Sequence, residues 1–123
     1  MNINSHLPIY EQLKQYFKSE IVSGHLKPGQ ELPSRRSIAQ DFKVNPNTVQ
    51  RAFKELEEES IITTDANVPS RVTEDIQIID ALRHTLLQQA MTDFYQLIQQ
   101  LNISPRIALE ALNEFIQQKE EKQ

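Results

Sequence analysis

The sequence predicts a mostly α-helical protein in which three helices and a small β-hairpin precede two C-terminal helices. Apolar residues recur at spacings of three and four over much of the 123-residue chain, as they do along one face of an α-helix. Serine or asparagine stands just before several of these stretches, where its side chain can cap a helix. The chain has only two glycines and no cysteine, so disulfides and thiolate chemistry are excluded.

The first helix is expected over residues 8–23. Pro8 suits an early helical position because its missing N–H costs nothing there. Gly24 can adopt the left-handed conformation that ends many helices, and Pro28-Gly29 marks a turn in the connector that follows. The apolar face of this helix is expected to comprise Ile9, Leu13, Phe17 and Ile21.

Two short helices follow, each with a capping residue at its start. Ser34 can cap the second helix, and Asn45 followed by Pro46 can open the third, which is expected to end near Glu59. The turn between them is Lys43-Val44. The buried faces are expected to comprise Ile38, Ala39 and Phe42 in the second helix and Val49, Ala52, Phe53 and Leu56 in the third. Two helices joined by so short a turn are typical of a helix-turn-helix.

Two β-prone runs, at residues 61–64 and 70–73, come after the third helix. Short runs of this kind, separated by turn-forming residues, predict a small hairpin. Together with the three helices, this hairpin, or wing, makes residues 1–73 an expected winged helix-turn-helix domain.

Residues 74–123 are expected to form a second, helical segment. A long helix is expected over about residues 75–102, and a last helix begins at Pro105 behind the cap Ser104. The end of the last helix, residues 119–123, is expected to fray. The long helix carries an apolar stripe made of Ile79, Leu82, Leu86, Ala90, Phe94, Leu97 and Leu101. The last helix is lined by Ile107, Leu109, Leu112, Phe115 and Ile116.

The charge of the chain is unevenly distributed. Its formal net charge is −4, but residues 34–51 hold four basic side chains and a single acidic one. Salt screens charges beyond roughly 8 Å, so this basic surface can act despite the acidic C-terminal half. No apolar run approaches the ~18 residues that span a bilayer, and Met1–His6 has neither the basic start nor the apolar core of a signal peptide. We therefore expect a cytoplasmic protein with no membrane partner.

The starts of the second and third helices combine the side chains that read DNA. A recognition helix enters the major groove by its N-terminal end, where Asn and Gln pair with adenine and Arg with guanine. The simpler interpretation is that Ser34 and Asn45 only cap their helices and that the arginines are solvated. We favour DNA because these residues occur together, and we interpret the acidic run at residues 57–59 as a solvated helix end that contacts no DNA. The candidate DNA-binding residues are Ser34, Arg35, Arg36, Asn45, Asn47, Thr48, Gln50 and Arg51.

Four motifs occur in order, at residues 8–12 (PIYEQ), 21–29 (IVSGHLKPG), 32–36 (LPSRR) and 44–49 (VNPNTV). Over residues 8–64 the chain resembles the winged helix-turn-helix domain of the GntR family, and its short helical remainder is similar to that of the YtrA subfamily. The resemblance implies a bacterial transcriptional regulator, usually a repressor, that binds an inverted repeat in double-stranded DNA as a homodimer. Several members govern genes for ABC-type transporters.

The resemblance also implies roles for single residues. Arg35 and Arg36 would contact phosphates or bases, and Arg51 would contact a phosphate. The groove readers would be Asn47, Thr48 and Gln50.

The wing departs from the family pattern. Ser60 stands where the family usually has glycine, and no glycine occurs at the tip, residues 65–70. Serine in a left-handed conformation costs about 1 kcal/mol relative to glycine. The wing is therefore expected to be shortened, disordered or differently shaped, with Arg71 as its single charge suited to phosphate.

The wide apolar stripe on the C-terminal helices needs a partner surface. It can pack only within the chain, hold a ligand between the last two helices, or form a homodimer interface. Roughly fifty residues leave little room for a drug-sized cavity of ~300 Å³, and a dimer matches the half-sites of a palindromic operator, so we favour the dimer. A small-molecule effector stays unassigned. The expected interface comprises Ile79, Leu82, Leu86, Ala90, Phe94, Leu97, Leu101, Leu112 and Phe115.

An enzyme is not expected. His6, His25 and His84 are scattered without metal-ligand spacing, and no nucleophile elbow, P-loop or dinucleotide-binding motif is present. We therefore expect neither a metal nor a cofactor. The main alternative function is a protein-interaction module that has kept the winged-helix fold and lost DNA binding, which the altered wing and the net acidity would favour.

Overall fold

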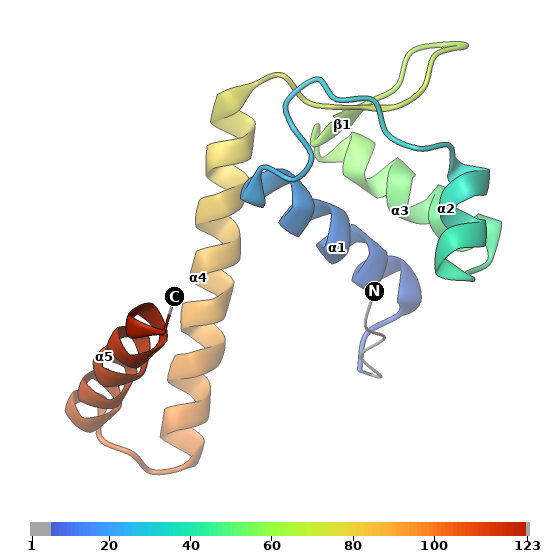
Figure 1. Ribbon diagram of the computed structural model, residues 1–123. Helices are drawn as coiled ribbons and strands as arrows, with labels where there is room; N and C mark the ends of the chain where they lie inside the picture. The colour runs from blue at the N-terminus through green and yellow to red at the C-terminus, as the bar shows by residue number, and fades with distance from the viewer. Residues whose placement is uncertain (1–5, 123) are drawn as a thin grey trace. The chain divides into compact units, whose positions relative to one another are not determined.

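The computed structural model describes residues 6–122 of the chain. The expectations for Met1–Ser5 and for Gln123 lie outside the described residues. Contacts divide the chain into two compact units after Arg83, which is within the fourth helix. The predicted order of helices and strands is confirmed. The elements, labelled in Figure 1, are α1 (Ile9–Ser23), α2 (Arg35–Phe42), α3 (Pro46–Glu58), β1 (Ile62–Thr63), β2 (Arg71–Val72), α4 (Ile76–Gln100) and α5 (Pro105–Glu121).

The core of the first unit forms where α1 packs against α3 (Figure 1). Phe17 of α1 meets Phe53 of α3 edge-on, with the ring centres 5.6 Å apart. The predicted apolar face of α1 is buried from Leu13 onward, whereas its first member, Ile9, is 40% exposed. The predicted stripe of α3 is buried throughout and comprises Val49, Ala52, Phe53 and Leu56.

The capping residues predicted for α2 and α3 hold their helix starts. The Ser34 hydroxyl oxygen accepts a hydrogen bond from the Ser37 N–H at 3.0 Å, and the Asn45 side-chain oxygen accepts one from the Asn47 N–H at 2.7 Å. Lys43, with a φ of 56°, reverses the chain between the two helices. These local bonds fix the short turn that brings α3 beside α2.

The hairpin is short and is extended by the connector that precedes α2. β1 and β2 pair antiparallel, with Ile62 opposite Val72. On the other side of β2, the Leu32 N–H donates to the Ser70 carbonyl oxygen at 2.8 Å, and Glu31 forms a bridge with Arg71. The strands are therefore two residues long, and the connector supports one edge of the wing.

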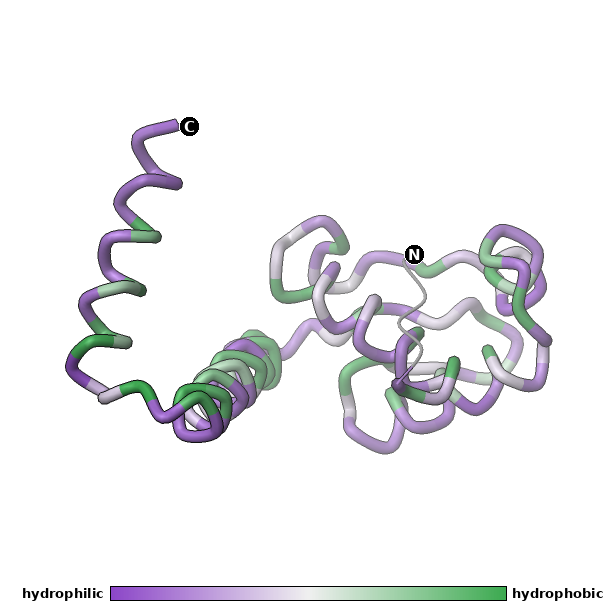
Figure 2. The backbone as a smooth tube through the Cα atoms, turned by 90° about the horizontal axis from the view of Figure 1, so that it is seen from below, coloured by the Kyte–Doolittle hydropathy of each residue, from purple (hydrophilic) through white to green (hydrophobic). Residues whose placement is uncertain are grey.

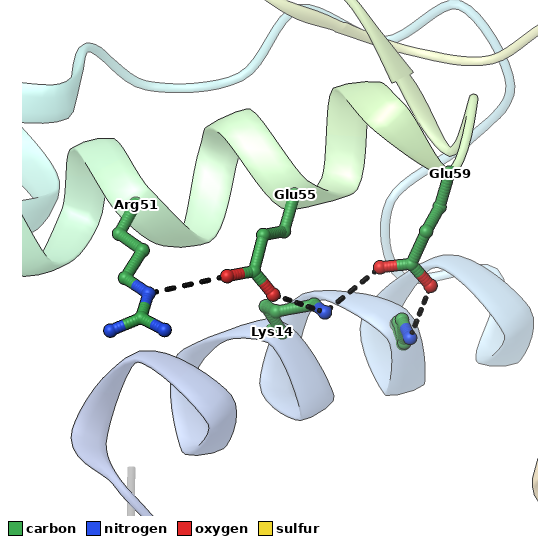
Figure 3. Close-up of polar contacts among 5 residues, drawn as sticks. Lys14, Arg51, Glu55 and Glu59 are labelled. Atoms are coloured by element: carbon green, nitrogen blue, oxygen red, sulfur yellow. Dashed lines mark hydrogen bonds and ion pairs between the residues drawn. The ribbon is translucent and has the colours of Figure 1, made fainter.

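An ion cluster around the buried Lys14 joins α1 to the end of α3. Figure 3 shows Lys14 reaching from α1 to Glu55 and Glu59, and its Nζ lies 2.9 Å from an oxygen of each. Lys18 lies 2.9 Å from the other oxygen of Glu59. Burial alone would lower the pKa of Lys14, but the bonds to Glu59 and Glu55 outweigh it and the pKa lies above its ordinary value. The interpretation of the acidic run as a solvated helix end is therefore wrong for Glu59, because two lysines of α1 bind it.

The second unit comprises the later turns of α4 together with α5. Among the described residues of this unit, only Ile98 and Ala108 are buried. Hydrophobic residues recur turn after turn along both helices, whereas the C-terminal end of α5 is hydrophilic (Figure 2). α5 stays helical through Glu121, so the prediction of a frayed end from residue 119 is wrong for the described residues.

Two apolar grooves run along the second unit, with volumes of about 480 and 630 Å³. Phe94 and Ile98 of α4 line both, as do Ala108 and Leu112 of α5. The expectation that so short a segment leaves little room for a drug-sized cavity is wrong, because both grooves exceed ~300 Å³. Within residues 6–122, no helix has the length and apolar content needed to cross a membrane.

Candidate nucleic-acid interface

The predicted site residues divide into exposed and half-buried groups at the starts of α2 and α3. Arg35 and Thr48 are half-buried. One contact links the two helix starts directly, because the Arg35 Nη1 donates to the Gln50 Oε1 at 2.6 Å. The exposed members are Ser34, Arg36, Asn45, Asn47, Gln50 and Arg51.

The start of α2 offers more free backbone donors than the start of α3. At α2, the Ser34 cap uses the Ser37 N–H, and the N–H groups of Arg35 and Arg36 donate to no other described residue. At α3, Pro46 has no N–H and the Asn45 cap uses that of Asn47. Because free N–H groups at a helix start attract anions, α2 is the better place for a phosphate.

The basic side chains of this surface differ in how far they are already engaged. The Arg36 side chain makes no hydrogen bond or ion pair with any of the described residues. Arg51 instead donates from Nε to Glu55 at 3.3 Å, and its guanidinium lies over the ring of Tyr10. Arg36 is thus the freer of the two to meet a phosphate.

Sequence reasoning missed Lys54 as a member of this surface. It is exposed on α3, four residues after Gln50 and seven after Asn47. Residues at these spacings lie on one face of a helix, so the spacing was the signal that could have identified it. Lys54 adds a positive charge one turn beyond the candidate groove readers.

Arg35 is held between α3 and the hairpin. Its Nη2 donates to the Glu57 Oε1 at 2.8 Å, and the same carboxylate oxygen accepts from the Thr64 hydroxyl at 2.6 Å. The Thr64 and Ser70 hydroxyls lie 2.7 Å apart. The interpretation of the acidic run as a solvated end is therefore also wrong for Glu57, which joins α2, α3 and the base of the wing.

The wing itself offers little positive charge. Arg71 donates from Nη1 to the Gly29 carbonyl oxygen at 3.3 Å and lies 3.8 Å from a Glu31 oxygen. The tip, residues 65–69, is exposed and carries one acidic side chain and no basic one. Asn67 turns the tip with a φ of 64°, and Ser60 enters the wing in the same left-handed conformation. Ser60, which replaces the usual glycine, and Asn67 of the glycine-free tip therefore both lie at left-handed backbone positions.

Residues 9–72 match the family described as bacterial regulatory proteins, gntR family. The transcriptional repressor YtrA of Bacillus subtilis (strain 168) is 38% identical over 117 residues, which cover 93% of this chain and 85% of that protein. A solved GntR family transcriptional regulator from Listeria monocytogenes has a TM-score of 0.85 at 33% identity, covering 91% of this chain and 98% of that one. AraR(DBD), solved in complex with operator ORR3, has a TM-score of 0.54 at 25% identity and covers 59% of this chain and 88% of that one.

Proposed function

Because this chain belongs to the gntR family of bacterial regulatory proteins, as a YtrA-like regulator, we propose that it is a repressor that binds an inverted-repeat operator as a homodimer. Its relatives are DNA-binding transcriptional regulators and not enzymes. The structure of AraR(DBD) bound to an operator supports the same use of the winged helix here.

The observation that carries this proposal is the exposed polar surface at two adjacent, capped helix starts. Asn47 and Gln50 present amide groups from the first turns of α3, and such groups read base edges in the major groove. Arg36 and the free N–H groups at the start of α2 suit a phosphate. We assign base reading to Asn47, Thr48 and Gln50. We assign backbone contacts to Ser34, Arg36, Asn45, Arg51 and Lys54.

A gel-shift titration tests the DNA-binding part of the proposal. The probe is the promoter upstream of the protein's own gene, and the control is a shuffled duplex of the same length and composition. We expect tighter binding to the promoter, with an affinity that falls steeply as salt is raised because phosphate contacts release counterions. Equal affinity for both duplexes would overturn specific recognition.

The second unit supports the homodimer. Two helices that bury so few side chains expose a wide apolar face, and two copies of the same face can cover each other about a two-fold axis. Ile79 and Leu82 are already buried within the first unit, at 5% and 8% exposure, so they have little area left for a partner. The proposed contact is concentrated on the exposed residues Ala90, Phe94, Leu97, Leu101 and Phe115, with the half-buried Leu86 and Leu112 beside them.

Sedimentation velocity tests the dimer. Phe94 lines both grooves, so Phe94→Glu is expected to yield a monomer, while Gln96→Glu on the same helix leaves the dimer intact. A wild-type chain that sediments as a monomer at all concentrations would overturn the proposal. A monomer whose melting temperature rises with an apolar small molecule would show instead that the grooves hold a ligand.

We further propose that the regulated genes encode a transporter, as the resemblance to the YtrA subfamily implies. Transcripts of the genes next to its own are expected to rise when this gene is deleted. Unchanged transporter transcripts in the deletion strain would overturn this assignment without affecting DNA binding.

A further inference from the structure

Arg35 is engaged by its own protein and does not extend freely into solvent. Its Nη1 donates to the Gln50 Oε1 at 2.6 Å and its Nη2 to the Glu57 Oε1 at 2.8 Å, and its guanidinium carbon lies 5.4 Å from the centre of the Phe53 ring. We propose that Arg35 is a positioning residue that orients the amide of Gln50 for base reading. The proposal rests on the DNA-binding function argued above.

The hydrogen bond fixes which end of the Gln50 amide is available. An amide has one acceptor oxygen and one NH₂ donor group, and Arg35 can only donate, so Oε1 must face it. The Nε2 donors of Gln50 bond to no other described residue. They are left for an acceptor on a base edge, such as a purine N7 in the major groove. Because the side chain is ordered before DNA arrives, less conformational entropy is lost on binding.

Glu57 holds Arg35 from the other side. Its Oε1 accepts both the Arg35 bond and a bond of 2.6 Å from the Thr64 hydroxyl, which lies 2.7 Å from the Ser70 hydroxyl. The guanidinium is therefore clamped between the reading face of α3 and the base of the hairpin. Only arginine has the planar fork that makes two such bonds at once.

Base preference, measured by selection from a randomised operator library, separates positioning from direct phosphate contact. The variants are Arg35→Met, which removes the clamp, and Arg35→Lys, which keeps the charge without the fork. We expect base preference at one position of each half-site to fall about tenfold in both variants. This is the discrimination between bases that one side-chain contact supplies. That position is the one whose preference Gln50→Ala also loses. Arg36→Met, at a proposed phosphate contact, is the comparison variant: it is expected to weaken binding to all sequences and to lower the salt slope by about 1, without the loss of preference at that one position.

Two results would overturn the positioning role alone. One is an Arg35→Met protein that keeps the wild-type preference but shows a salt slope lower by about 1, as for a lost phosphate contact. The other is full preference in Arg35→Lys. A wild-type chain that selects no sequence would instead overturn the proposed DNA-binding function, and this inference with it.

A stability cycle tests the same contact without DNA. Gln50→Ala removes the acceptor of the Arg35 hydrogen bond, so it is expected to lower the thermal unfolding midpoint of the wild-type chain. The same substitution in an Arg35→Met background is expected to lower it less, because the bond is already gone. Equal shifts in the two backgrounds would show that Arg35 and Gln50 do not interact and would overturn the proposal.

Discussion

The guanidinium carbon of Arg51 lies 3.6 Å from the centre of the Tyr10 ring. Arg51 belongs to the reading helix α3, and Tyr10 lies in the first turn of α1. A cation above an aromatic face is attracted by the electrons of the ring, and the Nε bond to Glu55 holds the same side chain from a second direction. Tyr10 of α1 therefore orients the Arg51 side chain of α3, for which we propose a contact with the DNA backbone.

Replacing Tyr10 with leucine is expected to lower the free energy of unfolding by roughly 0.5–1 kcal/mol, the value of an exposed cation–π contact. Tyr10→Phe keeps the ring and is expected to leave the free energy unchanged within error. Urea denaturation measures both. If the two variants lose the same stability, the ring face is not what holds Arg51.

Replacing Lys14 with methionine is expected to lower the free energy of unfolding by roughly 1–3 kcal/mol, as for hydrogen bonds to charged groups. Lys14 is 8% exposed and binds two carboxylates, which would lose their buried partner. Lys18→Met removes a more exposed pair and is expected to cost less than about 1 kcal/mol. Equal losses in urea denaturation would contradict a special role for Lys14.

Acidification is expected to destabilise the first unit through Glu55 and Glu59. The hydrogen bond from Lys14 lowers the pKa of Glu55 below its ordinary 4.5. For Glu59, burial would raise the pKa, but bonds from Lys14 and Lys18 outweigh it and lower the pKa. A carboxylate whose pKa is lowered in the folded state stabilises the protein at pH values above its pKa in the unfolded state. This stabilisation is lost as the pH falls through its pKa in the folded state.

The urea midpoint of the wild-type chain should therefore fall as the pH drops below 4.5, the ordinary pKa of these carboxyl groups. In Lys14→Met the bonds that lower both pKa values are gone or reduced, so its midpoint should fall less over the same range. Parallel curves for the two proteins would contradict the assignment to this cluster.

Replacing Ser60 with glycine is expected to stabilise the protein by up to about 1 kcal/mol. Ser60 has a φ of 64°, and glycine adopts this conformation without the clash of a Cβ atom. Asn67 has the same φ, but asparagine tolerates it better, so Asn67→Gly should gain less. Thermal denaturation of the pair checks the order, and a larger gain at Asn67 would refute it.

Replacing Asn47 with alanine is expected to relax base preference at one position by about 1–3 kcal/mol. Lys54→Ala, on the same helix, is expected to weaken binding to all sequences and to lower the salt slope by about 1. Selection from a randomised library and salt titrations distinguish the two. An unchanged preference in Asn47→Ala would remove it from the groove readers.

Local features of the fold could be predicted because their causes are local in sequence. Ser34 and Asn45 cap α2 and α3 through bonds to residues two or three positions away. The buried stripe of α3, which includes Val49 and Phe53, follows from helical periodicity alone. Such features need no knowledge of how the helices pack.

The pairing of charged side chains could not be predicted in this way. Lys14 meets Glu55 across 41 positions, and Arg35 meets Glu57 across 22. Which acid meets which base depends on how α1 and α2 pack against α3, and a run of glutamates at a helix end carries no sign of it. The acidic run was misinterpreted for this reason. The hydrogen bonds of Arg35 to Gln50 and Glu57 could not be predicted from the sequence either.

The bond between the Leu32 N–H and the Ser70 carbonyl oxygen closes a loop of chain that contains all of α2, the turn and α3. Separating the connector from the hairpin requires that this bond and the bridge between Glu31 and Arg71 break. Opening of the reading head should therefore be cooperative, with the amides of α2 and β2 exchanging with solvent at one common rate. The wing, even with a tip poor in charge, then holds the connector that leads into α2 beside β2.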